Sequence, residues 1–442
     1  MRFKAKRALT IPLVVSVVLA ATTARAEPMT LERVLALVNE APRAHVARAR
    51  AVASRAGVRT ANKLLRHNPT LRGSLETDAP FDNDGERSLG VAIEQAFELG
   101  GQQGLRRDLA GAESDEGAAS SAGAVADLKT EVVARFFEVD TLARELAVGR
   151  QVAEVYRRLS VSAAALVERG AITRIDLAVI DLEKTRVEAQ LARDSGWLEA
   201  ESRELASLAG RPTLAIEPVT SDAVAPLAAS ADALVADAVV RRPELAATRH
   251  RQRGATAKES LALREVWLTP TVAVGVKQER LVFGRGGLRL DAGAAPGLNG
   301  VDHRMWVAAV DLSIPLPVFE QRNTDRARAQ GELAIASAEE LATRDRIEGE
   351  VRAAAARADA AWRAFEISST TRTVAEETSA LVESAFARGA VTVNEVLVAH
   401  ERILRARLGV VRARGDVLRA RAVLAGARGH WSGEPSRIPA GL

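Results

Sequence analysis

Side chains that bind metals or catalyse reactions are few in this chain, and their spacing forms no recognisable site. The sequence has no cysteine and three methionines, which excludes a zinc finger, a cysteine enzyme and a disulfide-stapled module. The histidines are scattered without the spacing of metal ligands, at His45, His67, His250, His303, His400 and His430. Neither Gly-x-Ser-x-Gly nor His-Glu-x-x-His occurs. We therefore predict a protein that is not an enzyme and that holds no metal ion or cofactor.

One glycine-rich segment, residues 284–287, has the sequence Gly-Arg-Gly-Gly. A phosphate-binding loop would need a Lys-Ser or Lys-Thr pair and the start of a helix directly afterwards, and neither follows here. The segment is therefore interpreted as a flexible external loop.

Two segments share the pattern Arg-Gly-Ala-x-Thr, at residues 169–173 and 388–392. Glycine suits the left-handed end of one helix, and threonine suits the N-cap of the next. Each segment therefore predicts a tight turn between two helices. Six residues after each glycine lies a carboxylate, Asp176 in the first case and Glu395 in the second. In the first turn of a helix, such a carboxylate is favoured by the helix dipole.

Proline is absent between Pro80 and Pro212 and between Pro317 and Pro435. Both stretches are rich in Ala, Arg, Glu and Leu, which lose little free energy on entering a helix. Each stretch therefore predicts one very long helix, a turn and a returning helix. The expected helices cover 102–168, 174–209, 323–387 and 393–425. The longest would extend roughly 100 Å.

The two hairpins belong to two copies of one pattern, in which two shorter helices and two strands precede each hairpin. In the first copy we expect these helices near 31–39 and 43–66 and the strands at 70–77 and 88–97. In the second copy we expect the helices at 231–240 and 243–263 and the strands at 271–278 and 304–314. The chain then divides into a first repeat over 27–210, a linker over 211–230, a second repeat over 231–430 and a C-terminal tail over 431–442.

Each predicted strand alternates between an apolar face and a small or polar face. The apolar positions include Leu71, Leu75, Leu89, Val91, Ile93, Val272, Val274, Val276, Trp306, Val310 and Leu312. This pattern fits a tilted outer-membrane strand, and it also fits a half-buried sheet of a soluble protein. Four strands are too few to close a transmembrane barrel, so strands in a membrane would require several chains to share one barrel.

Residues 1–26 have the features of a secretory signal peptide. The segment holds no acid, an apolar stretch over 9–21 and a small-x-small site at 24–26, and its basic residues are Arg2, Lys4, Lys6, Arg7 and Arg25. These residues account for the formal net charge of +4, so the remainder gives no reason to expect a nucleic-acid partner. We expect a mature protein that starts near Glu27, outside the cytoplasm.

The motifs now described resemble those of the outer membrane efflux proteins, the TolC-like outer-membrane factors, and in particular their heavy-metal efflux branch. The most specific pieces are residues 94–101, residues 313–319 followed by Arg322 and Asn323, and the two Arg-Gly-Ala-x-Thr turns. The resemblance implies a mainly α protein with a small β part. It implies a homotrimer in which four strands per chain build a twelve-stranded barrel in outer-membrane lipid, and long antiparallel helical hairpins form a periplasmic tunnel.

The resemblance also implies site residues. The hairpin tips would dock on a periplasmic adaptor protein, and they comprise Gly170, Ala171, Ile172, Thr173, Gly389, Ala390, Val391 and Thr392. Asp176 and Glu395 would form a periplasmic gate with cation preference. Val398 stands where relatives often carry a second acid, and Asn323-Thr324-Asp325 departs from the heavy-metal branch, which usually has a glycine close after its Arg-Asn pair.

The function that follows is an outer-membrane exit duct of a tripartite efflux system. It would passively conduct heavy-metal cations or drugs from an inner-membrane pump of the resistance-nodulation-division type and a periplasmic adaptor to the exterior. The alternative is a periplasmic coiled-coil scaffold or adaptor that is not inserted in a membrane.

Overall fold

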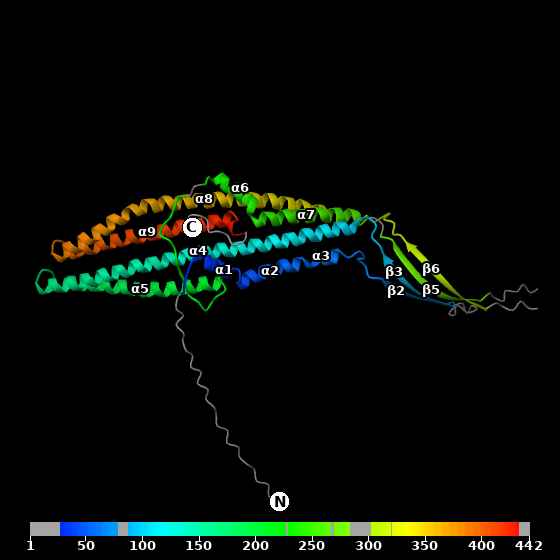
Figure 1. Cartoon of the computed structure of the whole chain (residues 1–442), viewed down its shortest axis with the longest axis horizontal. Helices are drawn as coiled ribbons and strands as arrows, with labels where there is room; N and C mark the ends of the chain where they lie inside the picture. The colour runs from blue at the N-terminus through cyan, green and yellow to red at the C-terminus, as the bar shows by residue number, and fades with distance from the viewer. Residues whose placement is uncertain are drawn as a thin grey trace, which may run out of the picture.

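The structure is a computed structural model, and it describes residues 27–77, 87–226, 229–266, 269–282, 302–319 and 321–432. The molecule is elongated, with long helices over most of its length and a sheet at one end (Figure 1). The predicted signal peptide and the glycine-rich segment at 284–287 lie outside the described residues, as does all but the start of the predicted C-terminal tail.

Four long helices form two antiparallel hairpins. The first hairpin consists of α4 (Gln102–Glu168) and α5 (Arg174–Leu208), and the second of α8 (Asn323–Ala387) and α9 (Val393–Ala427). Because α4 has 67 residues, it is roughly 100 Å long at about 1.5 Å per residue. The turns of both hairpins lie at the end of the molecule opposite the sheet (Figure 1). None of the helices in the described part of the chain is both long enough and apolar enough to cross a membrane.

Shorter helices flank the hairpins: α1 (Leu31–Val38), α2 (Pro42–Ser54), α3 (Ala56–Ala61), α6 (Ala231–Arg241) and α7 (Pro243–Arg264). The expectation of one helix over 43–66 is wrong, because the segment contains two helices, α2 and α3, and the second of them ends at Ala61. The break coincides with Ser54, whose hydroxyl donates a hydrogen bond to the carbonyl of Ala51 at 2.9 Å. Such local bonds compete with the backbone ladder and bend helices. Beyond the second helix, Pro69 disfavours helical backbone at the residue before it.

A four-stranded antiparallel sheet contains β2 (Thr70–Thr77), β3 (Arg87–Ala96), β5 (Thr271–Val282) and β6 (Asp302–Ser313), in the order β2-β3-β5-β6. The second-copy strands are longer than expected, since β5 runs to Val282 and β6 starts at Asp302. The register pairs Leu71 with Ile93, Ile93 with Val274 and Val274 with Val310. The apolar positions of all four strands therefore share one face, and nothing in the described part of the chain covers it: Leu71, Leu75, Leu89, Val91, Ile93, Val274, Val276, Trp306, Val310 and Leu312 are all exposed.

A second, very small sheet joins the start of the described chain to the linker between the two copies. Here β1 (Glu27–Met29) pairs in parallel with β4 (Ile216–Pro218). The amide of Glu27 bonds to the carbonyl of Ala215 at 2.8 Å, and the amide of Val219 bonds to the carbonyl of Met29 at 2.9 Å. Strands this short have no pattern that a sequence could reveal. The linker is therefore an ordered part of the fold.

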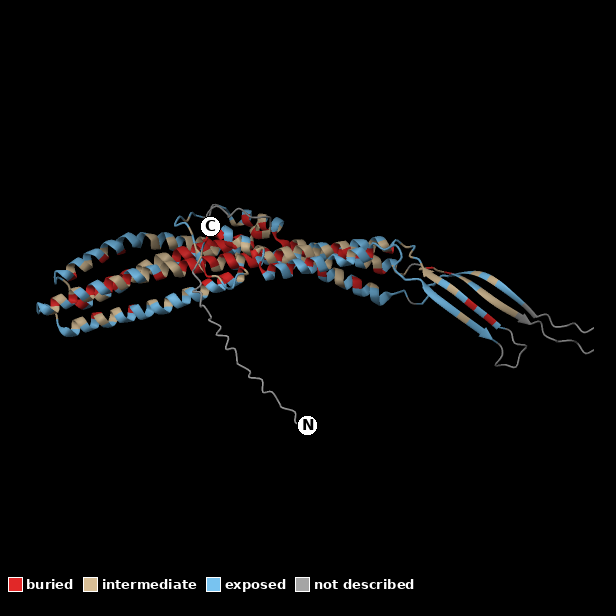
Figure 2. Cartoon of the chain, turned by 60° about the horizontal axis from the view of Figure 1, so that its bottom comes forward, coloured by how far each residue is buried: buried red, intermediate tan, exposed pale blue. Residues whose placement is uncertain are grey.

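Burial is concentrated in the middle of the helical part, as Figure 2 shows. The largest apolar cluster gathers around Phe136, Phe137 and Trp431, the last of which belongs to the one-turn helix η2 (His430–Ser432). A second cluster, near the hairpin turns, joins residues of α4 and α5 such as Tyr156 to residues of α8 and α9 such as Phe386. The two hairpins are thus packed against one another as far as their turns.

Candidate functional site

The turn of the first hairpin is built by Gly170, whose φ is +70°. Its amide donates to the carbonyl of Val167 at 3.0 Å, and the amide of Ala171 donates to the carbonyl of Leu166 at 2.9 Å. These two bonds form the Schellman motif, which ends a helix by satisfying its last carbonyls. Glycine is needed because it has no Cβ to clash in the left-handed conformation.

The second hairpin ends in the same way, although its sequence lies more than two hundred positions later. Gly389 has a φ of +72°, and its amide donates to the carbonyl of Phe386 at 2.8 Å. The amide of Ala390 donates to the carbonyl of Ala385 at 2.9 Å. Around both glycines an added Cβ would meet nothing within 4 Å. The glycines are therefore required by backbone conformation and not by crowding.

Each tip presents small residues to solvent and turns one apolar side chain inward. Gly170, Ala171 and Thr173 are exposed, as are their counterparts Gly389, Ala390 and Thr392. By contrast, Ile172 and Val391 are half-buried and pack on the apolar cluster that joins the two hairpins. Of the eight predicted tip residues, these two therefore anchor the turn, and the other six form its surface.

The two predicted gate carboxylates both form capping boxes. Asp176 accepts hydrogen bonds from the amide and the hydroxyl of Thr173 at 2.9 and 2.8 Å, and its own amide donates to that hydroxyl at 3.2 Å. Glu395 does the same with Thr392, at 2.7, 2.8 and 3.3 Å. In both cases the backbone amide, followed by the hydroxyl, lowers the pKa of the carboxyl group. Both groups therefore remain ionised at neutral pH and stabilise the start of a helix.

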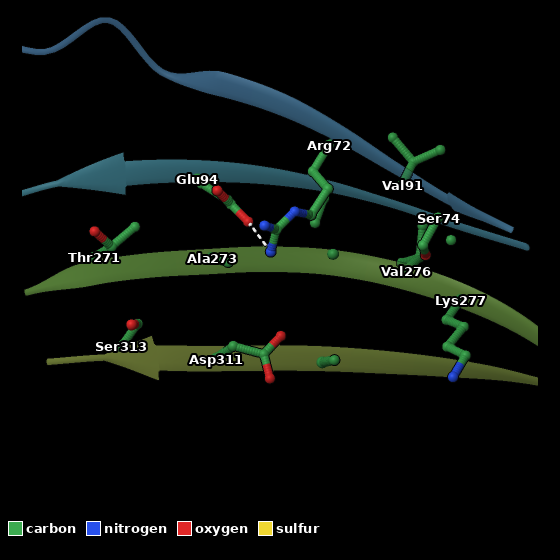
Figure 3. A pocket seen from close by; sticks show the side chains of 14 residues that line it. Arg72, Ser74, Val91, Glu94, Thr271, Ala273, Val276, Lys277, Asp311 and Ser313 are labelled. Carbon is green, nitrogen blue, oxygen red and sulfur yellow. Dashed lines mark ion pairs between the residues drawn. The ribbon is translucent and has the colours of Figure 1, made fainter. Parts of the chain in front are cut away.

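The face of the sheet opposite its apolar face is polar and lines a shallow hollow of about 440 Å³. Figure 3 shows charged side chains from neighbouring strands on this face. Arg72 of β2 and Glu94 of β3 form an ion pair at 2.7 Å, while Asp311 lies on β6. Between them Gly275 keeps β5 close to β3, because an added Cβ would lie 2.7 Å from the Cβ of Ala92. The sheet thus has one face suited to lipid and one suited to water.

The sequence and the fold both match known proteins. Residues 234–430 match the family described as outer membrane efflux protein. This match covers most of the second of the two predicted repeats and less than half of the chain. A search of curated proteins gives no match. The matched family is described as one of efflux proteins, which are transport proteins and not enzymes.

Solved structures with this fold cover nearly the whole chain. VceC from Vibrio cholerae is 17% identical over 90% of this chain and 96% of that chain, with a TM-score of 0.69. The CmeC outer membrane channel of Campylobacter jejuni is 12% identical over 92% and 87%, with a TM-score of 0.67. The open state of the MtrE outer membrane channel of Neisseria gonorrhoeae is 17% identical over 90% and 88%, with a TM-score of 0.64.

The match of residues 234–430 confirms the predicted resemblance to this family, and the solved structures confirm the predicted fold class, which is mainly α with a small β part and long antiparallel hairpins. The solved proteins are themselves described as an outer membrane protein or as outer membrane channels. The predicted tip residues and carboxylates of this chain lie at the end of the molecule far from the sheet (Figure 1). The residues predicted to dock and to gate therefore share one end of the molecule.

A buried charge network in the middle of the molecule could not be foreseen from the sequence. Asp140 of α4 accepts from Arg414 of α9 at 2.7 Å, from Arg144 at 3.1 Å and from the hydroxyl of Thr220 at 2.8 Å. Arg414 also donates to the carbonyl of Ser221 at 2.5 Å. The network ties both hairpins to the linker. Its only sequence signal is a polar pair in the linker, Thr220-Ser221, which reads equally well as a solvated turn.

The predicted absence of metal ligands can be compared with the structure only in part. Within the described residues, no three His, Asp or Glu side chains are grouped so that they could hold a metal ion. His400 lies in α9 near the tips, where burial lowers the pKa of its imidazole. Its ring contacts Tyr156 with ring centroids 6.1 Å apart. This histidine therefore packs as a neutral core residue between the hairpins.

Proposed function

We propose that three copies of this chain form a closed duct through the outer membrane. The observation that carries the proposal is the exposed apolar face of a sheet whose outer strands, β2 and β6, each pair on one side only within the described residues. An unpaired strand edge in lipid costs several kcal/mol for each backbone group. Pairing the β2 edge of one copy with the β6 edge of the next removes both edges, and three copies would supply twelve strands.

We therefore expect a trimer when the full chain is extracted from outer membranes and the mass of the complex is measured by native mass spectrometry in detergent. Extraction should require detergent, because the apolar face would be in contact with lipid. A periplasmic scaffold would instead be released by osmotic shock. A stable monomer in detergent, or release without detergent, would contradict the duct.

The duct would conduct substrates delivered by other proteins. We propose that the six exposed tip residues dock on a periplasmic adaptor, which joins the duct to an inner-membrane pump of the resistance-nodulation-division type. Small residues at a helix turn allow another helix tip to approach the backbone closely. Heavy-metal cations or drugs are the proposed cargo, and the pump would select among them, since a passive duct only conducts.

We further propose that Asp176 and Glu395 act as a gate with cation preference where three copies converge. Their capping role makes a selective test available. Glu395→Gln with Asp176→Asn removes the charge but keeps an oxygen that can accept the capping bonds. In planar-bilayer recordings across a salt gradient, this double variant should shift the reversal potential toward that of a non-selective pore.

The pH dependence of selectivity follows from the lowered pKa of both carboxyl groups. Selectivity should persist at mildly acidic pH and be lost only as the pH falls through these lowered values. The capping contribution to stability has the same sign, because a group whose pKa is lower in the folded state stabilises it above the unfolded pKa. Thr392→Ala is the matched control, since it removes a cap without changing charge and should leave the reversal potential unchanged. An unchanged potential in the double variant would show that the carboxylates only cap helices.

A further inference from the structure

A hollow of about 460 Å³ lies between the helices α2 and α4, close to the one-turn helix η2. Figure 1 shows α2 running beside α4, and the two helices are in contact. The wall of the hollow has an apolar part that includes Ala51 of α2 and Val125 of α4. Its charged residues are Arg48, Arg55 and Lys129, and no described aspartate or glutamate lines it. The hollow therefore combines an apolar wall with positive charge.

The three basic side chains of the hollow form no ion pair within the described residues. Arg48 donates a hydrogen bond to the carbonyl of Asn39 at 2.7 Å, and the side chain of Arg55 bonds to no other described residue. On the same helix, by contrast, Arg43 pairs with Glu131 of α4 at 3.1 Å. Arg48 and Arg55 are both exposed, so their guanidinium groups are available to a ligand that enters from solvent.

Lys129 is the most buried of the three charges, with 7% of its surface exposed. Within the described residues its ammonium group makes one hydrogen bond, to the carbonyl of Trp431 at 3.4 Å, although such a group can donate three. Burial, followed by the nearby charge of Arg48, lowers the pKa of Lys129, and no acid is close enough to raise it. The indole Nε1–H of Trp431, which also lines the hollow, is buried without a hydrogen-bond partner in the described chain. The wall thus holds donors and positive charge that lack an acceptor.

We propose that this hollow binds a phosphate monoester that carries a small apolar group. A phosphate monoester is largely a dianion at neutral pH, and its oxygens accept hydrogen bonds from guanidinium and ammonium groups. Arg48 and Arg55 are separated by about 10 Å along α2, a distance that two long side chains can span from opposite sides of one phosphate. The apolar group would lie against the alanine and valine side chains of the wall, which removes it from water. All of these residues belong to one chain, so the site does not depend on the proposed duct.

The test measures binding of phenyl phosphate to the full chain in detergent by isothermal titration calorimetry, and saturable binding at one site per chain is the expected result. Inorganic phosphate lacks the ring and should bind at least about tenfold more weakly. Phenol lacks the charge and should not bind. Because a hydrogen bond between charged groups is among the strong ones, Lys129→Met should weaken binding of phenyl phosphate by about tenfold or more. Arg48→Gln with Arg55→Gln should weaken it at least as much.

A loss of binding in Lys129→Met can be separated from a loss of structure. The substitution removes a buried charge that has no counter-ion among the described residues, so it should not lower the denaturant midpoint of the protein without ligand. The matched control is Lys184→Met, which removes a lysine of α5 that already pairs with Asp181 and should leave the affinity unchanged. Glu434→Gln asks whether the chain supplies its own anion, because Glu434 follows Ser432 of the hollow by two positions. Affinity should be unchanged in this variant too.

Five results would each overturn the proposal. They are the absence of saturable binding to the native chain, equal binding by Lys129→Met, equal binding of inorganic phosphate or phenol, an equal loss in the Lys184 control, and binding that appears only in Glu434→Gln. The last of these would mean that a carboxylate of the chain itself neutralises the hollow.

Discussion

Replacing Asp140 with alanine is expected to destabilise the helical part by about 3–5 kcal/mol. Asp140 and Arg414 are 4% and 7% exposed, and their ion pair measures 2.7 Å. Without the carboxylate, the guanidinium of Arg414 would remain buried with no counter-ion, which is among the most costly changes in a protein interior. The same substitution would also remove an acceptor from the hydroxyl of Thr220.

The measurement is the denaturant midpoint of the purified protein in detergent, followed by far-ultraviolet circular dichroism. Asp416→Ala is the control, because Asp416 forms an exposed ion pair with Arg419 one turn away and should cost less than about 1 kcal/mol. Asp140→Leu combined with Arg414→Met should recover most of the loss, since an apolar pair can replace a buried ion pair. If Asp140→Ala were as stable as the control, the buried network would not contribute to stability.

Efflux is expected to be lost when Ala171 and Ala390 are both replaced by tryptophan. Both alanines are exposed at the tips, and each takes part in its turn only through its backbone amide. The indoles would therefore occupy the proposed docking surface without breaking the turns. Substituting Gly170 or Gly389 would be less informative, because their positive φ makes any side chain strained.

The readout is the tolerance of cells to the pump's substrates, with the amount and oligomeric state of the protein in outer membranes measured in parallel. Loss of tolerance with normal trimer levels is the expected outcome. Ala171→Ser with Ala390→Ser is the matched control, since it keeps the tips small and should preserve tolerance. Normal tolerance in the double tryptophan variant would mean that the tips are ordinary helix turns.

The long helices could be predicted because their signals are local. Proline-free, alanine-rich stretches and the glycine and threonine of each turn specify where α4 and α8 end and where α5 and α9 begin, and these helices agree with the expected bounds to within two residues. Local signals were insufficient where neighbours decide the outcome. The division of α2 from α3 is an example, because Ser195 inside the unbroken α5 makes the same hydroxyl-to-carbonyl bond as Ser54 at the break, so this bond alone does not specify the break.

The buried charge network and the surroundings of each sheet face could not be predicted from the sequence for a different reason. Asp140 and Arg414 are separated by 274 positions, and each is one charged residue among many on a long helix. Nothing in the sequence marks them as buried partners. Alternation along the strands likewise specified two faces without showing whether protein or lipid covers the apolar one. The register and the exposure of residues such as Leu71 and Val310 show that no other described segment of the chain covers it.

The two open edges of the four-stranded sheet also have a genetic consequence. In the proposed trimer, no copy can complete its own membrane-spanning part. Every functional trimer is therefore assembled from three chains drawn at random from all the copies in the cell. If half the chains carried tryptophan at both tip alanines, only about one trimer in eight would contain native tips alone. Such a variant would therefore be dominant over the native protein when the two are made together.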